Sequence, residues 1–362
     1  MEIEDYLALK KDRLEKTSRS IKDYQVFDFE YIPARPLMRE EVKPIADAVL
    51  RYLKTGIPNH LLIVGSRGSG KTLLVRYLMQ RLIDGSRAQS LYVNCRHHNT
   101  SFKILAELLQ LRPRGFALDE LWAQFRDKFS GPAVVVLDEA DLISEKDRNK
   151  DILYLLSRSE HPYMVILLSN NPHFHQQLDL SIQSTLQPEI VHFRNYDAEQ
   201  VRAILDQRAR LGLWMCGSSD LAKIAAMVVR LTNSDIRVGI KALYLNALEP
   251  EAGIEANFDR ARHDIVTDLI RGLSDRNLTI LQAATGVPDG HVKSVYALYR
   301  RLSNQIGDSP FSYVYFYSNL AYLQSIGLII LVSTKVRRSY TNRIQLLFDP
   351  QVLGPIWQAR FG

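Results

Sequence analysis

The segment Gly65–Thr72 limits the fold of this chain more than any other, because it reads GSRGSGKT and matches the full phosphate-loop pattern G-x-x-x-x-G-K-[ST]. The apolar run Leu61–Val64 precedes it and is typical of a buried strand. A helical pattern from Thr72 to Leu82 follows it. A strand before the loop and a helix after it are the context that the motif requires. The segment therefore predicts an α/β domain that binds a nucleoside triphosphate.

The residues of the loop suit the binding of phosphate groups. Gly68, Ser69 and Gly70 are small, so successive backbone N–H groups can curl around phosphates, and the following helix adds its positive dipole end. We expect Lys71 to reach the β- and γ-phosphates and the hydroxyl of Thr72 to ligate Mg²⁺. ATP or ADP with Mg²⁺ are the predicted cofactors.

Two further strands end in polar residues that complete such a site. Residues 134–141 read VVVLDEAD, and an apolar strand that ends in Asp-Glu is the usual partner of a phosphate loop. We expect Asp138 to hold Mg²⁺, directly or through water. We expect Glu139 to polarise the attacking water, because hydrolysis requires a proton acceptor in line with the γ-phosphate. Another apolar strand ends before Asn170, which is expected to orient water and sense the γ-phosphate, with Asn171 as the second choice. The alternative, a turn asparagine that only ends the strand, stays open.

Strand and helix patterns alternate up to Phe193 and then change. Strands that alternate with helices indicate a parallel sheet covered on both faces. After Phe193 no strong strand signal appears before Leu328, where two strand-like segments follow a run of helices. We therefore divide the chain into a P-loop α/β base domain at 1–195, a small helical domain at 196–257 and a winged helix-turn-helix at 258–362.

The elements of this division are read from apolar periodicity and from capping residues. The predicted strands are Leu61–Val64, Ser90–Val93, Ala133–Leu137, Met164–Leu168, Ile190–Phe193, Leu328–Ser333 and Ile344–Phe348. The predicted helices are 39–53, 72–82, 201–211, 219–231, 235–248, 259–273, 278–284, 292–305 and 310–326, with a helix-start capping pattern at Asp197 and Gln200.

The charge of the chain is concentrated at its C-terminal end. The formal net charge is +6, and residues 262–362 carry eleven Lys and Arg against six Asp and no Glu. A basic C-terminal domain predicts a polyanionic partner, nucleic acid first, although a solvated basic face is the alternative. No apolar stretch approaches the roughly 18–20 residues that span a bilayer. The two cysteines lack metal-ligand spacing and are expected to be free thiols in a reducing compartment. Together with the lack of a long apolar stretch, this predicts a cytoplasmic protein without membrane contact.

The winged-helix segment offers candidate DNA contacts on a helix and on a hairpin. The predicted helix 310–326 has an apolar stripe formed by Phe316, Leu320 and Leu323. Its other faces carry the candidates Tyr313, Tyr315, Asn319 and Tyr322, for which packing against neighbouring helices stays open. Cations with an aromatic residue at the hairpin suit phosphate and minor-groove contact. These candidates are Lys335, Arg337, Arg338, Tyr340 and Arg343.

These segments, in this order, resemble the archaeal replication initiators, an AAA+ family that unites the origin recognition complex and the cell-division-cycle helicase loader. The resemblance covers roughly Tyr31 to the C-terminus. It implies that the entry motif Tyr31, Ile32 and Pro33, together with Arg39, lies beside adenine, although Met38 replaces a usual histidine. It also implies that the lid starts at Tyr196, and that the motif ending in Arg237 contributes a sensor arginine. An arginine there could reach the phosphates when base and lid close.

The resemblance implies an ATP-switched initiator that binds repeated origin elements in double-stranded DNA. It also implies a slow ATPase that is associated with the nucleoid. Its implied partners are other initiator paralogues and the replicative MCM helicase. One departure is Ser181, which stands where the family often carries an arginine associated with a neighbouring subunit's nucleotide. A nucleotide-switched transcriptional regulator derived from the same family is therefore the alternative. An AAA+ helper of another class is a third hypothesis, which the C-terminal winged helix disfavours.

Overall fold

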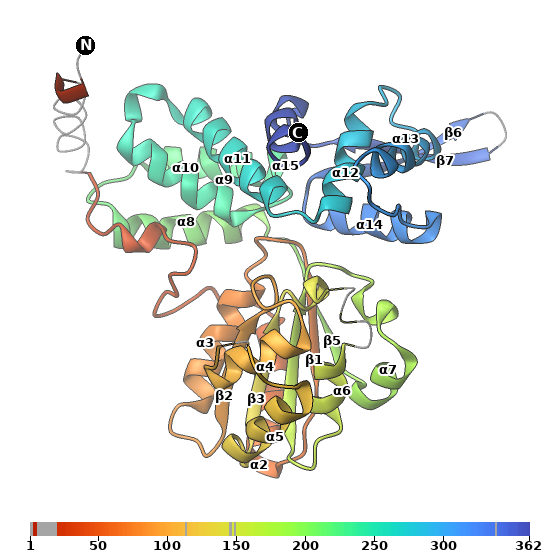
Figure 1. The fold of residues 1–362 in the computed structure, drawn as a ribbon. Coiled ribbons are helices and arrows are strands. Elements are labelled where there is room, and N and C mark those ends of the chain that lie inside the picture. Colours follow the sequence, from red (N-terminus) through yellow and green to blue (C-terminus); the bar gives the residue numbers. More distant parts are fainter. Residues whose placement is uncertain (1–2, 6–19, 113, 145–146, 148–149, 337–338) are drawn as a thin grey trace. The chain divides into compact units, whose positions relative to one another are not determined.

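The computed structural model describes residues 3–5, 20–112, 114–144, 147, 150–336 and 339–362. It divides into two compact units, each described here by itself (Figure 1). One unit is Met38–Arg194, and the other joins residues up to Leu37 to Asn195–Gly362.

The unit Met38–Arg194 is built on a parallel sheet with the strand order β2-β3-β4-β1-β5. Its strands are β1 Leu61–Gly65, β2 Gln89–Asn94, β3 Ala133–Asp138, β4 Tyr163–Ser169 and β5 Glu189–Phe193. Each predicted strand of this sheet is confirmed to within one residue at both ends. The apolar runs are continuous because β1, β3 and β4 are covered on both faces, which leaves no exposed side.

Helices cover the two faces of this sheet, and strand residues alternate between them (Figure 1). Leu61 and Ile63 pack with α2 Val42–Thr55 and α3 Lys71–Ile83. Leu62 and Val64 pack on the opposite face. That face is covered by α4 Ser101–Leu109, α5 Leu118–Lys128, α6 Asp151–Ser157 and α7 Leu180–Leu186, four helices that the sequence reading did not locate.

A buried histidine at the start of this sheet predicts a loss of stability in acid. The Nδ1 atom of His60 accepts a hydrogen bond from the backbone N–H of Val165 at 3.1 Å, and burial lowers the pKa of His60 from 6.5 to about 4. The unfolded chain therefore binds this proton first, and stability falls as pH drops from about 6.5 towards 4. The full cost is about 3 kcal/mol, of which about 2 kcal/mol is lost between pH 7 and 5.

The measurement is urea unfolding at pH 7 and 5 of the wild type and His60→Asn, whose side-chain oxygen can accept the same bond. We expect the acid-induced fall in unfolding free energy to be about 2 kcal/mol smaller in the variant. An equal fall in both proteins would contradict this assignment.

In the second unit, the segment predicted as the lid is helical. Its helices are α8 Ala198–Gly212, α9 Ser218–Leu231 and α10 Ile236–Leu248. The predicted capping box is confirmed, because Asp197 accepts from the N–H of Gln200 at 2.8 Å while Gln200 accepts from the N–H of Asp197 at 3.2 Å. Residues 22–31 pack against α8. The N–H of Lys22 donates to the carbonyl of Gly212, and Arg208 donates to the carbonyls of Val26 and Tyr31.

The C-terminal part of this unit has the order of a winged helix. Its elements are α11 Ile254–Arg271, α12 Asp275–Thr285, α13 Val292–Gln305, α14 Tyr313–Ser325, the antiparallel pair β6 Ile329–Val336 and β7 Ser339–Leu346, and α15 Leu353–Phe361. The short 3-10 helices of the chain are Gln25–Phe27, Ala140–Leu142, Phe174–Gln177, Pro250–Ala252 and Pro350–Val352. In the described part of the chain, no helix is both long enough and apolar enough to cross a membrane.

The structure departs from the sequence-based predictions for this region at three places. The helix predicted at 259–273 begins earlier, at Ile254, because Gly253 takes a φ of 83° and lets α11 start directly after it. The second hairpin strand starts at Ser339 rather than Ile344, since it pairs with β6 along its whole length. The helix α15 was not expected, and Arg360 ties it to the carbonyls of Leu273 and Arg271 at 2.7 Å each.

Candidate nucleotide site and DNA-binding surface

The strand order places the predicted catalytic segments at one edge of the parallel sheet. The phosphate loop follows β1, Asn170 follows β4, and Asp138 ends β3. Because β4 lies between β1 and β3, Asn170 is placed between the loop and the Asp-Glu motif. The carboxyl ends of parallel strands are a common place for ligand sites in α/β sheets.

The ammonium group of Lys71 joins the loop to the neighbouring strand. It donates to the carbonyls of Gly65 at 2.7 Å and Ser66 at 2.9 Å, and to Oδ1 of Asn170 at 3.0 Å. The lysine is 7% exposed. An ammonium group has three donors, and these contacts hold it at the mouth of the loop.

Glycine and arginine residues set the shape of the loop. Gly68 and Gly70 have φ values of 75° and 87°, which side chains rarely adopt. A Cβ on Gly65 would lie 2.7 Å from the carbonyl oxygen of Phe193, so the loop passes close to β5. Arg39 is buried and donates to the carbonyl of Ser69 at 2.9 Å, which places this predicted nucleotide-binding residue against the loop backbone.

The predicted metal ligands lie together. Oδ2 of Asp138 accepts from the hydroxyl of Thr72 at 2.8 Å and from that of Tyr92 at 2.8 Å, and its Oδ1 accepts from the N–H of Glu139 at 2.8 Å. Burial raises the pKa of Asp138, and the bonds from Tyr92 and Thr72 oppose that rise. A hydroxyl and one carboxylate are hard oxygen donors that fit Mg²⁺.

This donor set is small. Among the described residues, no group of three or more His, Cys, Asp or Glu side chains could hold a metal ion. Mg²⁺ commonly takes one or two protein carboxylates, water and phosphate oxygens of a bound nucleotide. Thr72 and Asp138 therefore fit a cation that binds together with nucleotide.

Glu139 is engaged by an arginine that sequence reasoning missed. The guanidinium of Arg96 donates from Nε to Oε2 of Glu139 at 2.6 Å and from a terminal nitrogen to Oε1 at 3.2 Å. Arg96 follows β2, which pairs with β3, so the pairing of strands brings it to Glu139. The sequence around Arg96 carries no motif, and only the strand order could have identified it.

Asp141, the last residue of the VVVLDEAD run, is a second residue that was not singled out. Its Oδ1 accepts from the N–H of Asn170 at 3.2 Å, which fixes the backbone that carries the predicted sensor. Burial raises the pKa of Asp141 to about 6. The Asp-Glu-x-Asp spacing was the available signal for it.

The remaining predicted nucleotide contacts belong to the second unit. Arg237 forms a two-armed ion pair with Asp235, the residue that caps α10. The guanidinium of Arg208 lies 4.8 Å from the ring centre of Tyr31, and Tyr196 is buried ahead of α8. The approach of the 31–33 segment, Tyr196 and Arg237 to a nucleotide stays a prediction.

Helix α14 presents a polar aromatic face without charged side chains. Its predicted apolar stripe of Phe316, Leu320 and Leu323 is fully buried. Tyr313 and Tyr315 are exposed, whereas Tyr322 is buried, which removes it from the candidate contacts. The candidate Asn319 uses its side-chain amide to donate to the carbonyl of Tyr315 at 2.8 Å.

Two residues on this face were missed: Val314, which is 76% exposed, and Tyr317, which accepts a hydrogen bond from the side-chain amide of Asn342 on β7. A hydrogen bond between side chains therefore joins the exposed face of α14 to β7. Arg343 on β7 is exposed, and a terminal nitrogen of its guanidinium lies 3.3 Å from Nε2 of His291. Lys335 and Tyr340 lie on the paired strands, whereas Arg337 and Arg338 lie outside the described residues.

Comparisons with known proteins agree with this architecture. A family model described as an AAA domain matches residues 57–178, which contain the phosphate loop, the Asp-Glu motif and Asn170. The ORC1-type DNA replication protein 1 of Archaeoglobus fulgidus is 24% identical over 376 residues, and the match covers 94% of this chain and 91% of that protein.

Solved structures give the same result for the fold. The Aeropyrum pernix ORC1 protein in complex with DNA has a TM-score of 0.67 at 21% sequence identity, covering 95% of this chain and 98% of that one. The Aeropyrum pernix ORC2 protein in its ADPNP-ADP complexes has a TM-score of 0.60 at 22% identity, covering 94% and 99%. The AAA+ fold class and the resemblance to archaeal replication initiators are confirmed.

Proposed function

We propose that this chain is an ATP-binding and ATP-hydrolysing replication initiator that binds double-stranded origin DNA and helps to recruit the replicative MCM helicase. The observation that carries the proposal is the hydrogen-bonded cluster at the sheet edge, in which Lys71 contacts Asn170 and Thr72 contacts Asp138. It occurs in a chain whose relatives are named DNA replication proteins along almost its full length. Other initiator paralogues are the proposed co-assembling partners.

Each residue of the cluster has a proposed task. Bound ATP with Mg²⁺ supplies the phosphoryl group and the cation that neutralises its charge. Lys71 exchanges its loop carbonyls for phosphate oxygens, and Thr72 and Asp138 hold the cation. Asn170, fixed by Asp141, orients the attacking water.

Two ion pairs of the described structure, Arg96 with Glu139 and Arg237 with Asp235, must break before the proposed hydrolytic state can form. Glu139 accepts the proton of the attacking water after its carboxylate leaves Arg96. Arg237 reaches the phosphates when base and lid close, and phosphate oxygens then replace the carboxylate of Asp235. Both exchanges need rearrangement of existing salt bridges, which is consistent with a slow, switch-like ATPase.

The test of this function is recovery of genomic fragments. Purified protein is incubated with sheared genomic DNA of its host in ATP and in ADP, and the recovered sites are footprinted. Enrichment of one or a few intergenic regions with repeated elements, with a nucleotide-dependent footprint, supports the initiator. No enrichment over random duplex in either nucleotide would contradict it.

The transcriptional regulator remains the second candidate because of one observation. Ser181 occupies the exposed first turn of α7, where the family often carries an arginine that acts on a neighbouring subunit. Serine cannot supply a cation to another subunit's phosphates. Scattered promoter sites in the recovery experiment would favour this regulator over the initiator.

Arg343 provides a prediction about DNA affinity. Replacing Arg343 with Ala should weaken binding to all duplexes by a similar factor and reduce the slope of log affinity against log salt by about 1, because one phosphate contact is lost. The measurement is a fluorescence-anisotropy titration of labelled duplexes at several salt concentrations. Arg210→Ala, a surface arginine on the lid helix α8, is the control with the same charge change. An unchanged slope would show that Arg343 does not contact a DNA phosphate.

A further inference from the structure

Tyr92 connects the edge strand of the base sheet to the predicted metal ligand. It lies on β2, opposite Val136 in the pairing of β2 with β3, and its hydroxyl donates to Oδ2 of Asp138 at 2.8 Å. Neither the phosphate-loop motif nor the Asp-Glu motif includes this residue, and the proposed mechanism gives it no task.

The carboxylate of Asp138 is fixed from three directions. Oδ2 accepts from Tyr92 on β2 and from Thr72 on α3, and Oδ1 accepts from the backbone N–H of Glu139. Asp138 is 3% exposed, so water does not readily replace a donor that is removed. Loss of one donor therefore leaves this carboxylate with fewer constraints on its orientation.

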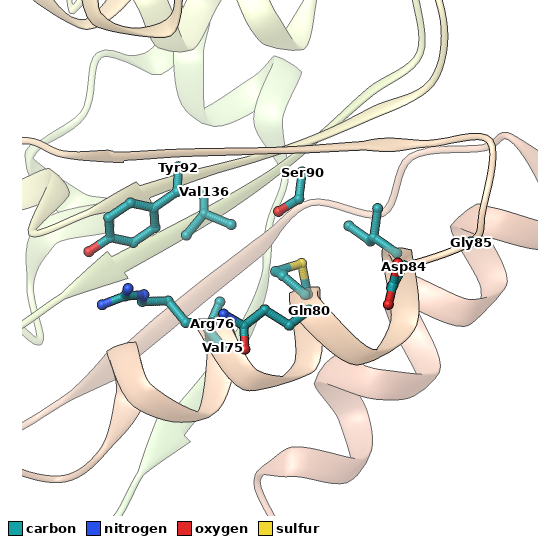
Figure 2. Close-up of a pocket in the computed structure, with 10 residues that line it drawn as sticks. Val75, Arg76, Gln80, Asp84, Gly85, Ser90, Tyr92 and Val136 are labelled. Atoms are coloured by element: carbon teal, nitrogen blue, oxygen red, sulfur yellow. The ribbon is translucent and has the colours of Figure 1, made fainter. Parts of the chain in front are cut away.

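The ring of Tyr92 faces helix α3 across a pocket. It forms one wall of a pocket of about 560 Å³ between α3 and β2, with Val75, Met79 and Val136 among the other lining residues (Figure 2). Figure 2 shows the ring and Arg76 facing each other, and the guanidinium carbon of Arg76 lies 5.5 Å from the ring centre. Arg76 is one helical turn after Thr72 on α3. Helix α3 therefore contacts the ring of Tyr92 through Arg76 and the carboxylate of Asp138 through Thr72.

A tyrosine is chemically suited to this position. Its hydroxyl gives a hydrogen bond to the carboxylate without adding charge, whereas a lysine or arginine would place a second cation beside Mg²⁺ and repel it. Thr72 can donate its proton to Asp138 while its oxygen lone pairs face the cation. Tyr92 and Thr72 can therefore both keep their bonds to Asp138 when a cation is bound.

We propose that Tyr92 is a positioning residue that orients the Asp138 carboxylate toward the magnesium ion bound with nucleotide. This inference rests on the proposed function, because it takes Asp138 as a ligand of that ion. It assigns to the edge strand β2 a part in metal binding that the two sequence motifs do not contain.

The test is the Mg²⁺ dependence of binding of fluorescent mant-ADP to Tyr92→Phe. This change removes only the hydroxyl, and the ring stays in the pocket wall beside Arg76. We expect the Mg²⁺ concentration that gives half of the affinity gain to rise about tenfold, the effect of losing one hydrogen bond to a charged group. Affinity for mant-ADP in EDTA should stay as in the wild type.

The control is Tyr154→Phe. Tyr154 lies on α6, has a similar exposed fraction to Tyr92, and its ring is likewise contacted by an arginine, in this case Arg158. An unchanged Mg²⁺ requirement in Tyr92→Phe overturns the positioning role. An equal loss of affinity in EDTA also overturns it, because the hydroxyl would then act on nucleotide binding in general.

A wild type that binds no mant-ADP, or an Asp138→Asn variant with the wild-type Mg²⁺ requirement, defeats the proposed site itself and the inference with it. If the wild type binds mant-ADP and the affinity of Asp138→Asn no longer rises with Mg²⁺, the proposed site stands. The result for Tyr92→Phe then tests the positioning role alone. Thermal unfolding of each variant without nucleotide reports whether the pocket wall is intact.

Discussion

Lys71→Ala should bind ATP and ADP at least about a hundredfold more weakly than the wild type, because it removes charge-assisted hydrogen bonds to the phosphates. In the structure the ammonium group is already at the mouth of the loop, held by two loop carbonyls and Asn170. Nucleotide binding exchanges carbonyl oxygens for phosphate oxygens of higher charge, and alanine has no donor to make that exchange. The measurement is isothermal titration of nucleotide-free protein.

The control for this variant is Lys54→Ala, at the exposed end of α2, which changes the net charge equally. Lys71→Arg separates charge from shape, because a planar guanidinium keeps the charge but does not fit the same position between carbonyls. Wild-type affinity in Lys71→Ala would show that the phosphate loop has been assigned wrongly.

Glu139→Gln should retain nucleotide and lower the rate of hydrolysis by at least about a hundredfold, the usual effect of losing a general base. The amide cannot accept a proton from water, whereas Lys71, Thr72 and Asp138 keep their contacts. The measurement is single-turnover release of phosphate from γ-labelled ATP, together with the affinity for ATP.

Glu160→Gln, an exposed glutamate after α6, is the matched control. Hydrolysis at the wild-type rate in Glu139→Gln would assign the base to another residue. Because Arg96 holds both carboxylate oxygens of Glu139, the variant also tests whether that ion pair affects binding: equal ATP affinities mean that it does not.

The sequence predicted those parts of the site that lie within short motifs. The five strands of the base sheet carry continuous apolar runs, and the loop, Asp138 and Asn170 follow three of them directly. Their proximity could be expected because parallel strands present their carboxyl ends at one edge. The capping box at Asp197 was equally local and was confirmed.

Other parts depend on pairings between distant segments and were missed. Arg96 and Tyr92 contact Glu139 and Asp138 only because β2 pairs with β3, and no local pattern states that pairing. Periodicity places Tyr322 off the main stripe and so among the candidate DNA contacts, yet it is buried. The pair of Arg237 and Asp235 lies within one motif, but its geometry depends on how α10 is capped.

In the proposed DNA complex, the absence of charged side chains from α14 separates sequence preference from overall affinity. Counter-ion release depends on cations beside the phosphates, and such residues lie on the hairpin and on α13 rather than on this helix. The tyrosines and Val314 of α14 can instead contact base edges and methyl groups, interactions that are insensitive to salt. If the chain binds DNA as proposed, substitutions on α14 would change which sites it prefers without changing its overall attraction to DNA.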